Sequence, residues 1–374
     1  MKRLAYIDWM RGLACVLMFQ AHCYDSWLTP EWHRTEFVRW TQILGTAPAP
    51  LFLFIAGVSV SLTTTRFREK GIGRWQIAKH TILRGAEVFG LGLLFRIQEY
   101  ALGHKWVPWT DLLRVDILNV LGLSIAFMGA LCWLASARDA ELTRRRSQSL
   151  AVLMGTLVAL LTPPLWSTWR PRFLPWPLES YINGVHNLGT PQYWLFPIFP
   201  WCAFAFIGLA TGFAIFSPTA KKNESRLFVW LAVAGALSIA LSIAIDASPI
   251  HLYALQDYWH ASPSFFLLRC GMLLVLLAIG YAWCQKGFGQ QGFSPVIQLG
   301  KTSLLVYWVH LEFVYGRFSI LRKHECGLGK ATIGLVVIFL WMWALSLWRT
   351  QAKETTATAL RRQPQPGPLV PATG

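Results

Sequence analysis

The sequence has 374 residues, of which 54% are hydrophobic and only 14% are charged, and its mean hydropathy is +0.41. A soluble domain carries charge on about a quarter of its residues, so this composition excludes an ordinary soluble protein and indicates a polytopic membrane protein. The net charge of +16 does not indicate a nucleic-acid partner, because the Lys and Arg residues alternate with apolar runs instead of forming one basic domain.

Apolar runs long enough to cross a bilayer follow one another along most of the chain. The sequence therefore predicts an all-α bundle of about ten transmembrane helices, surrounded by membrane lipid. We expect residues 1–350 to form one transmembrane domain and the Pro-rich residues 351–374 to form a disordered cytoplasmic tail. The expected spans are 4–22, 46–63, 80–97, 115–135, 149–166, 194–216, 227–245, 263–284, 297–316 and 331–348.

The distribution of Lys and Arg predicts the orientation of these spans. Basic stretches such as "TRFREKGIGRWQIAKH" (65–80) and "RDAELTRRRSQS" (138–149) follow every second span, so both termini are expected in the cytoplasm. The setting expected for such a chain is a bacterial inner membrane. The seven Cys have no metal-binding or CxxC spacing, which predicts small apolar residues and no metal.

The first span, "IDWMRGLACVLMFQAHCYDSW" (7–27), contains four ionisable residues: Asp8, Arg11, His22 and Asp25. Arg11 and His22 are eleven residues apart, which is close to three helical turns, so both face one side of the helix about 16 Å apart. Ionisable residues inside a span usually face a cavity and mark function. The alternative is that Asp8 and Arg11 form an ion pair at the inner edge and His22 marks the outer edge.

Several segments resemble one known family. "IDWMRGLACVLMFQAH" resembles the opening span of the transmembrane acyltransferase superfamily, whose bacterial members carry an Arg and a His at this spacing. "APLFLFIAGVSVSL" (49–62), "VDILNVLGLSIAFMG" (115–129) and "LGKTSLLVYWVH" (299–310) are similar to later family segments. The branch that it resembles most is the heparan-alpha-glucosaminide N-acetyltransferase-like one, over most of residues 3–316.

This resemblance implies an acyl-CoA-dependent acyltransferase, with acetyl-CoA as the expected co-substrate. The acyl group would pass from the cytoplasmic side to a hydroxyl or amine of a glycan or amino-sugar acceptor at the outer face. The resemblance assigns Arg11 to the cofactor path and His22 to catalysis. In the eukaryotic branch the essential histidine lies in the following loop, where this chain has His33, so His33 is the second candidate base.

Histidine suits this role because its unperturbed pKa lies near 6.5. Asp25 either orients the ring of His22 or is a solvated loop residue. The phosphates of acyl-CoA need cations at the cytoplasmic face. We expect these from Arg84, which has Glu87 one turn on, and from Arg66 and Arg68, with Asp8 as the partner of Arg11.

Five residues in later spans are candidates for the acceptor site. His310 and Tyr307 are one turn apart in the outer half of the ninth expected span, although a lone His on an apolar helix is more often structural. Asp116 and Asn119 either bind a sugar hydroxyl or cap their helix. Arg269 either pairs with Asp246 or Asp116, or binds an anionic acceptor. The residues concerned are His310, Tyr307, Asp116, Asn119 and Arg269.

Two other functions compete with the acyltransferase. A transporter or exporter of a small solute would also contain buried charges, but it favours internal repeats and paired broken helices, which the sequence lacks. A haem protein could use His22 and His310 as its two axial ligands. The sequence is compatible with an oligomer as well as with a monomer.

Overall fold

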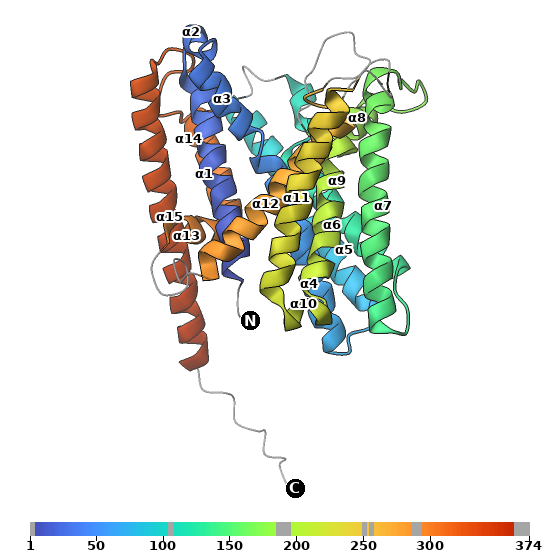
Figure 1. The fold of residues 1–374 in the computed structure, drawn as a ribbon. Helices are drawn as coiled ribbons and strands as arrows, with labels where there is room; N and C mark the ends of the chain where they lie inside the picture. The colour runs from blue at the N-terminus through green and yellow to red at the C-terminus, as the bar shows by residue number, and fades with distance from the viewer. Residues whose placement is uncertain are drawn as a thin grey trace.

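The computed structural model describes residues 4–103, 108–184, 196–248, 253, 258–285 and 294–362. Within these ranges the chain is helical and contains no strand apart from an isolated bridge between Leu28 and Cys326. This confirms the predicted all-α bundle, which Figure 1 shows as long helices packed side by side. All seven cysteines are free and buried, as expected of small apolar residues.

The long helices coincide with the expected spans. Seven helical segments are long and apolar enough to cross a membrane, among the residues that the structure describes, so the chain is an integral membrane protein. The long helices are α1 (Ala5–Trp27), α4 (Pro48–Glu69), α5 (Arg74–Gly103), α6 (Ile117–Leu134), α7 (Ala140–Ser167), α9 (Ile198–Ile215), α11 (Glu224–Asp246), α12 (Pro263–Gln285) and α15 (Leu328–Arg362).

Burial separates the central helices from the peripheral ones. Within the 18-residue apolar stretch of each helix, 72% is buried in α9, compared with 17% in α11 and 28% in α15. The core therefore lies around α9, α4, α6 and α1, and the peripheral helices present apolar side chains to lipid. A helix that is apolar on all sides can serve as such a lipid-facing element.

Both ends of the described chain lie at the same end of the bundle, where α1 begins and α15 ends (Figure 1). We call this the inner end and the opposite one the outer end. Four short helices lie at the outer end, whereas α10 (Pro218–Lys222) lies at the inner end. The outer helices are α2 (Pro30–His33), α3 (Glu36–Gly45), η1 (Trp109–Leu113) and α8 (Trp176–Asn183). At the inner end α15 continues to Arg362, into the stretch that we predicted as a tail, and residues 363–374 lie outside the described ranges.

The ninth expected span, 297–316, is not one continuous helix. It consists of α13 (Pro295–Lys301) and α14 (Ser303–Val314), which are separated at Thr302. The backbone of Thr302 has φ −126° and ψ 25°, and its hydroxyl donates to the Ser346 hydroxyl on α15 at 2.6 Å. The sequence did not predict this break, because neither Pro nor Gly occupies position 302.

Two glycines bring α1 and α13 into backbone contact. A Cβ atom added to Gly12 would lie 1.7 Å from the carbonyl oxygen of Val296, and one added to Gly300 would lie 1.8 Å from that of Asp8. Membrane helices use such small residues to approach closely, since no hydrophobic driving force operates between them in lipid. Arg11 and Lys301 adjoin these two glycines in the sequence, so the contact brings their backbones close together.

The sidedness of the bundle can be tested by labelling single cysteines in a background without native Cys. Phe173 is 81% exposed in an outer-end segment, and Lys70 is exposed at the inner end. Because the Lys/Arg distribution predicts a cytoplasmic inner end, an impermeant thiol reagent added to intact cells should label Phe173→Cys and spare Lys70→Cys. The reverse pattern would contradict the predicted orientation.

Candidate active site

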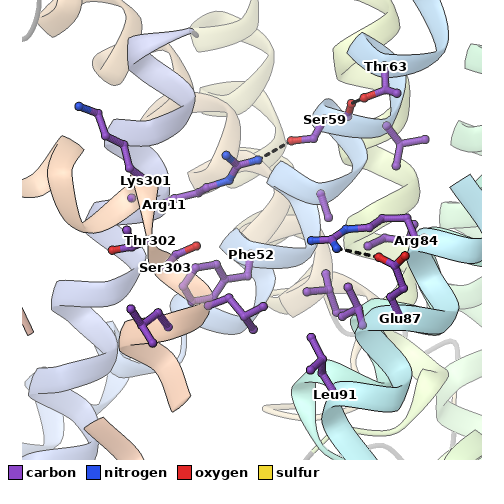
Figure 2. A pocket seen from close by; sticks show the side chains of 18 of the residues that line it. Arg11, Phe52, Ser59, Thr63, Arg84, Glu87, Leu91, Lys301, Thr302 and Ser303 are labelled. Carbon is purple, nitrogen blue, oxygen red and sulfur yellow. Dashed lines mark hydrogen bonds and ion pairs between the residues drawn. The ribbon is translucent and has the colours of Figure 1, made fainter. Parts of the chain in front are cut away.

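A cavity of about 980 Å³ opens toward the inner end and is lined by residues of α1, α4, α5, α6, α13, α14 and α15. Arg11 reaches into it from α1, where its Nη2 donates to the Ser59 hydroxyl on α4 at 2.6 Å. Its Nη1 donates to a carboxylate oxygen of Asp8 at 3.3 Å. Figure 2 shows Arg11 and Arg84 extending into this inner cavity from different walls. The predicted pair of Asp8 and Arg11 thus forms, and Arg11 additionally faces the cavity.

The inner cavity is strongly cationic. Arg84 lines it with its predicted partner Glu87, at 2.9 Å. The charged residues that line it are Arg11, Arg84, Lys301, Arg349 and Lys353, against the single carboxylate of Glu87. Thr302 and Ser303 also line it, so α14 begins at the cavity wall, and the first backbone N–H groups of a helix favour anions. Such an excess of cations suits a ligand with several phosphates.

Sequence reasoning missed three of these cations. Lys301 belongs to the segment "LGKTS", and Arg349 and Lys353 stand four residues apart on α15, a spacing that places both on one helix face. That spacing was the available signal. This spacing did not stand out, because Lys and Arg at the cytoplasmic end of a span are expected from membrane orientation alone.

Two of the predicted cofactor contacts lie elsewhere. Arg68 lines a separate cavity of about 600 Å³ and donates to the Ser136 hydroxyl and the Ala137 carbonyl, at 3.4 and 3.1 Å. Arg66 does not line either cavity. Both residues lie in the last turn of α4, beyond the part of this helix that lines the inner cavity. Their closeness in sequence to the cavity-lining residues of α4 therefore does not bring them to the cavity.

A second cavity, of about 560 Å³, lies toward the outer end and contains His22. Its walls include the aromatic side chains of Phe196, Trp201 and Trp259. Among the described residues that line the inner and outer cavities, Phe52 of α4 alone belongs to both. Arg11 and His22 therefore each line a cavity bounded by Phe52, which agrees with their predicted position on one face of α1.

His22 forms a hydrogen bond with His310 of α14. The two ring nitrogens, Nδ1 of His22 and Nε2 of His310, lie 2.9 Å apart, and the rings are stacked with centroids 5.2 Å apart. This contact leaves no space for an iron atom between the rings, so they cannot be the two axial ligands of one haem. The sequence proposed both histidines but did not predict that they bond to each other.

The partners of the two rings determine where their protons lie. Nδ1 of His310 is 2.9 Å from the Val306 carbonyl oxygen, which can only accept, so this nitrogen carries a proton. In a neutral His310 the Nε2 atom is then the acceptor, and Nδ1 of His22 must be the donor. Nε2 of His22 is left with an unshared lone pair at the outer cavity, which is the form of imidazole that removes a proton.

The other predicted catalytic residues lie apart from this cavity. His33 is on α2, where its ring centroid is 6.4 Å from that of His324, and it does not line the outer cavity. Asp25 is exposed and accepts a hydrogen bond from the Tyr315 hydroxyl at 2.7 Å. The Tyr315 ring lies 5.3 Å from the ring of His22. Asp25 therefore bonds to Tyr315 and reaches His22 only through this ring.

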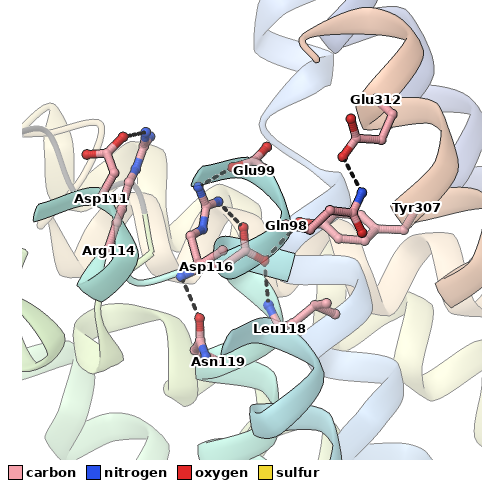
Figure 3. A network of polar contacts seen from close by, with 10 residues as sticks. Gln98, Glu99, Asp111, Arg114, Asp116, Leu118, Asn119, Tyr307 and Glu312 are labelled. Atoms are coloured by element: carbon pink, nitrogen blue, oxygen red, sulfur yellow. Dashed lines mark hydrogen bonds and ion pairs between the residues drawn. The ribbon is translucent and has the colours of Figure 1, made fainter. Parts of the chain in front are cut away.

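Asp116 and Asn119 form a capping box at the start of α6. The carboxylate of Asp116 also accepts from the Tyr307 hydroxyl at 2.9 Å and from Arg96 at 2.5 Å (Figure 3). Of the two roles that the sequence left open, helix capping is the one that these contacts support. Tyr307 lines the outer cavity, but its hydroxyl is bonded to Asp116.

Arg269 of α12 lines the outer cavity together with His22. Its guanidinium lies 4.0 Å from the Phe265 ring centroid and 5.7 Å from that of Trp201. Of the alternatives left open for Arg269, an ion pair with Asp246 or Asp116 is not present among the described residues, and Asp116 is paired with Arg96.

The fold and the two cavities define an integral membrane protein with polar chemistry inside its helical bundle. The heparan-alpha-glucosaminide N-acetyltransferase catalytic family matches residues 3–245, and the chain belongs to this family. The match confirms the resemblance seen in the first span and identifies an acetyltransferase of membrane type. It includes Arg11, His22 and Phe52 and ends before Arg269 and His310. No curated protein matches the sequence.

Proposed function

We propose that this protein transfers an acetyl group from acetyl-CoA, bound in the inner cavity from the cytoplasm, to a sugar hydroxyl or amine in the outer cavity. The membrane would be a bacterial inner membrane. The observation that carries this proposal is the arrangement of the two cavities, one cationic and one with an unshared imidazole lone pair, with Phe52 as their common wall.

The inner cavity suits the nucleotide end of acetyl-CoA. Its five cations and the start of α14 match a ligand with several phosphates. An extended pantetheine arm that followed α1 from Arg11 would cover the roughly 16 Å to His22. The thioester would then reach Phe52, at the boundary between the two cavities.

In the outer cavity His22 would act as the general base. Its Nε2 takes a proton from the acceptor hydroxyl or amine as the oxygen or nitrogen attacks the thioester carbonyl. The carbon–sulfur bond breaks, and the departing thiolate of CoA takes the proton from the imidazolium. His310 is a positioning residue in this scheme, because its Nε2 accepts from Nδ1 of His22 and fixes the required tautomer.

A direct measurement can decide which of the two candidate histidines, His22 or His33, is the general base. His22→Ala should lower acetyl transfer by about 10²- to 10⁴-fold, the usual contribution of a general base, while acetyl-CoA binding is retained. His33→Ala should have little effect, because His33 lies on α2 beside His324 and not at the outer cavity. Both variants should be assayed as purified, folded protein. Loss of transfer in His33→Ala but not in His22→Ala would reject this assignment.

The location of the CoA site can be tested with matched variants. Arg11→Ala and Lys301→Ala should each weaken CoA binding by roughly tenfold or more, which is the scale of a lost hydrogen bond to a charged group. Arg68→Ala is the control, since Arg68 lines the separate cavity. Calorimetry with purified protein gives the affinities. Arg11→Ala is also measured together with Asp8→Asn, because the single change leaves the buried carboxylate of Asp8 without the guanidinium of Arg11. If Arg68→Ala alone weakens binding, CoA occupies the other cavity.

Phe52 should limit the acyl group that can pass between the cavities. Phe52→Ala would open their common wall, so the preference for acetyl-CoA over butyryl-CoA should fall by about tenfold or more, because one methylene in a pocket is worth about 10–200-fold. Phe54→Ala is the control, since Phe54 is fully buried and its backbone packs against Gly208 of α9. An unchanged acyl preference in Phe52→Ala would mean that Phe52 does not lie on the acyl path.

A further inference from the structure

Arg269 lines the outer cavity and has no counterion among the residues that the structure describes. No described residue accepts a hydrogen bond from it, and its Nε is buried without a partner. Removing a charge from water is energetically costly unless an opposite charge compensates it, and this cost is why ionisable residues in membrane spans are rare and usually functional. A structural role would be expected to come with an acidic partner.

Within the described part of the chain, the surroundings of Arg269 contain no such partner. None of the described residues that line the outer cavity is Asp or Glu. Arg39, the other arginine of the lining, is 67% exposed and lies 3.8 Å from Glu36, so it is solvated and paired. Arg269 is therefore the less exposed arginine of this lining and has no acidic partner among the described residues, and it shares the cavity with the proposed base.

Aromatic rings hold Arg269 in place without using its donors. The guanidinium lies over the Phe265 and Trp201 rings, which attract it by cation–π interaction but accept no ordinary hydrogen bonds. Trp201 also lines the cavity together with Trp259, and flat aromatic faces of this kind pack against the apolar face of a sugar ring. The result is a fixed cation beside an aromatic wall in a cavity of about 560 Å³, within the usual ~300–1,000 Å³ of small-ligand sites.

From these contacts we infer that Arg269 is an anion subsite, so that the acceptor is an acidic sugar that carries a carboxylate or sulfate group beside the acetylated position. The fork of the guanidinium matches the two oxygens of such a group. The sugar ring rests on Trp201, and its hydroxyl or amine faces Nε2 of His22. The identification of this ligand as the acceptor rests on the proposed function, whereas the binding of an acidic sugar at Arg269 does not.

The binding test uses two pairs of sugars that differ only in charge, glucuronic acid against glucuronamide and glucosamine 6-sulfate against glucosamine. Purified full-length protein should bind the charged member of at least one pair about 10- to 100-fold more tightly, read by tryptophan fluorescence. Arg269→Met should abolish this preference and Arg269→Lys should keep part of it. Arg39→Met, the same change at the exposed arginine of the cavity, should leave the preference unchanged.

The inference is overturned if neither pair shows a charge preference in the wild-type protein, or if Arg269→Met keeps the preference. Acetyl transfer to the same sugars separates this result from the proposed function. Charge-selective binding that depends on Arg269, without transfer to any sugar, would retain the subsite and reject the acetyltransferase assignment to these acceptors. Transfer to charged and neutral sugars with equal kcat/KM would support the acetyltransferase activity and would reject Arg269 as an anion subsite.

Discussion

The close packing of α1 against α13 and α14 determines where the groups of both cavities lie. At the inner end, Gly12 and Gly300 allow the two backbones to touch, which places Arg11 and Lys301 on the same cavity. At the outer end, the bond from His22 to a histidine of α14 joins the same two segments. A displacement of α13 and α14 from α1 would therefore disturb the phosphate-binding and proton-accepting sides of the proposed reaction together.

The hydrogen-bonding capacity of the buried polar groups separates structural from functional candidates. In lipid an unsatisfied polar group is costly, and Asp116 is accordingly saturated by a capping box, an arginine and a tyrosine. His22 and Arg269 differ from it, because each keeps bonding capacity directed at the same cavity. A bilayer interior retains such groups where a ligand completes them, and this is the reason for assigning chemistry to these two residues.

The sequence predicted the helices well because each apolar run is long enough to identify a span without tertiary information. It also placed Arg11 and His22 on one helix face, since that relation depends only on the helical repeat. The bond between His22 and His310 joins residues 288 positions apart, and no local pattern contains that information. Both histidines could be nominated as ionisable residues in spans, but their pairing required the packed structure.

The different positions of the predicted cations relative to the inner cavity have a related physical cause. Arg66 and Arg68 follow α4 toward the inner end, and basic residues there are required by membrane orientation whether or not they bind a ligand. Sequence proximity to the first spans favoured them over Lys301, which lies far along the chain. Only the contact between α1 and α13 distinguishes a cation that lines the cavity from one that marks the membrane side.

The break at Thr302 allows one span to serve both cavities. Because the helix restarts at Ser303, the first turn of α14 faces the inner cavity, where the positive end of its helix dipole favours an anion. Two turns further on, the same helix carries His310, whose ring is held by the Val306 carbonyl and fixes the tautomer of His22. The broken span therefore couples an anion-binding end to a proton-accepting end through about two turns of rigid helix, which places the proposed donor and acceptor chemistry at a fixed separation across the bundle.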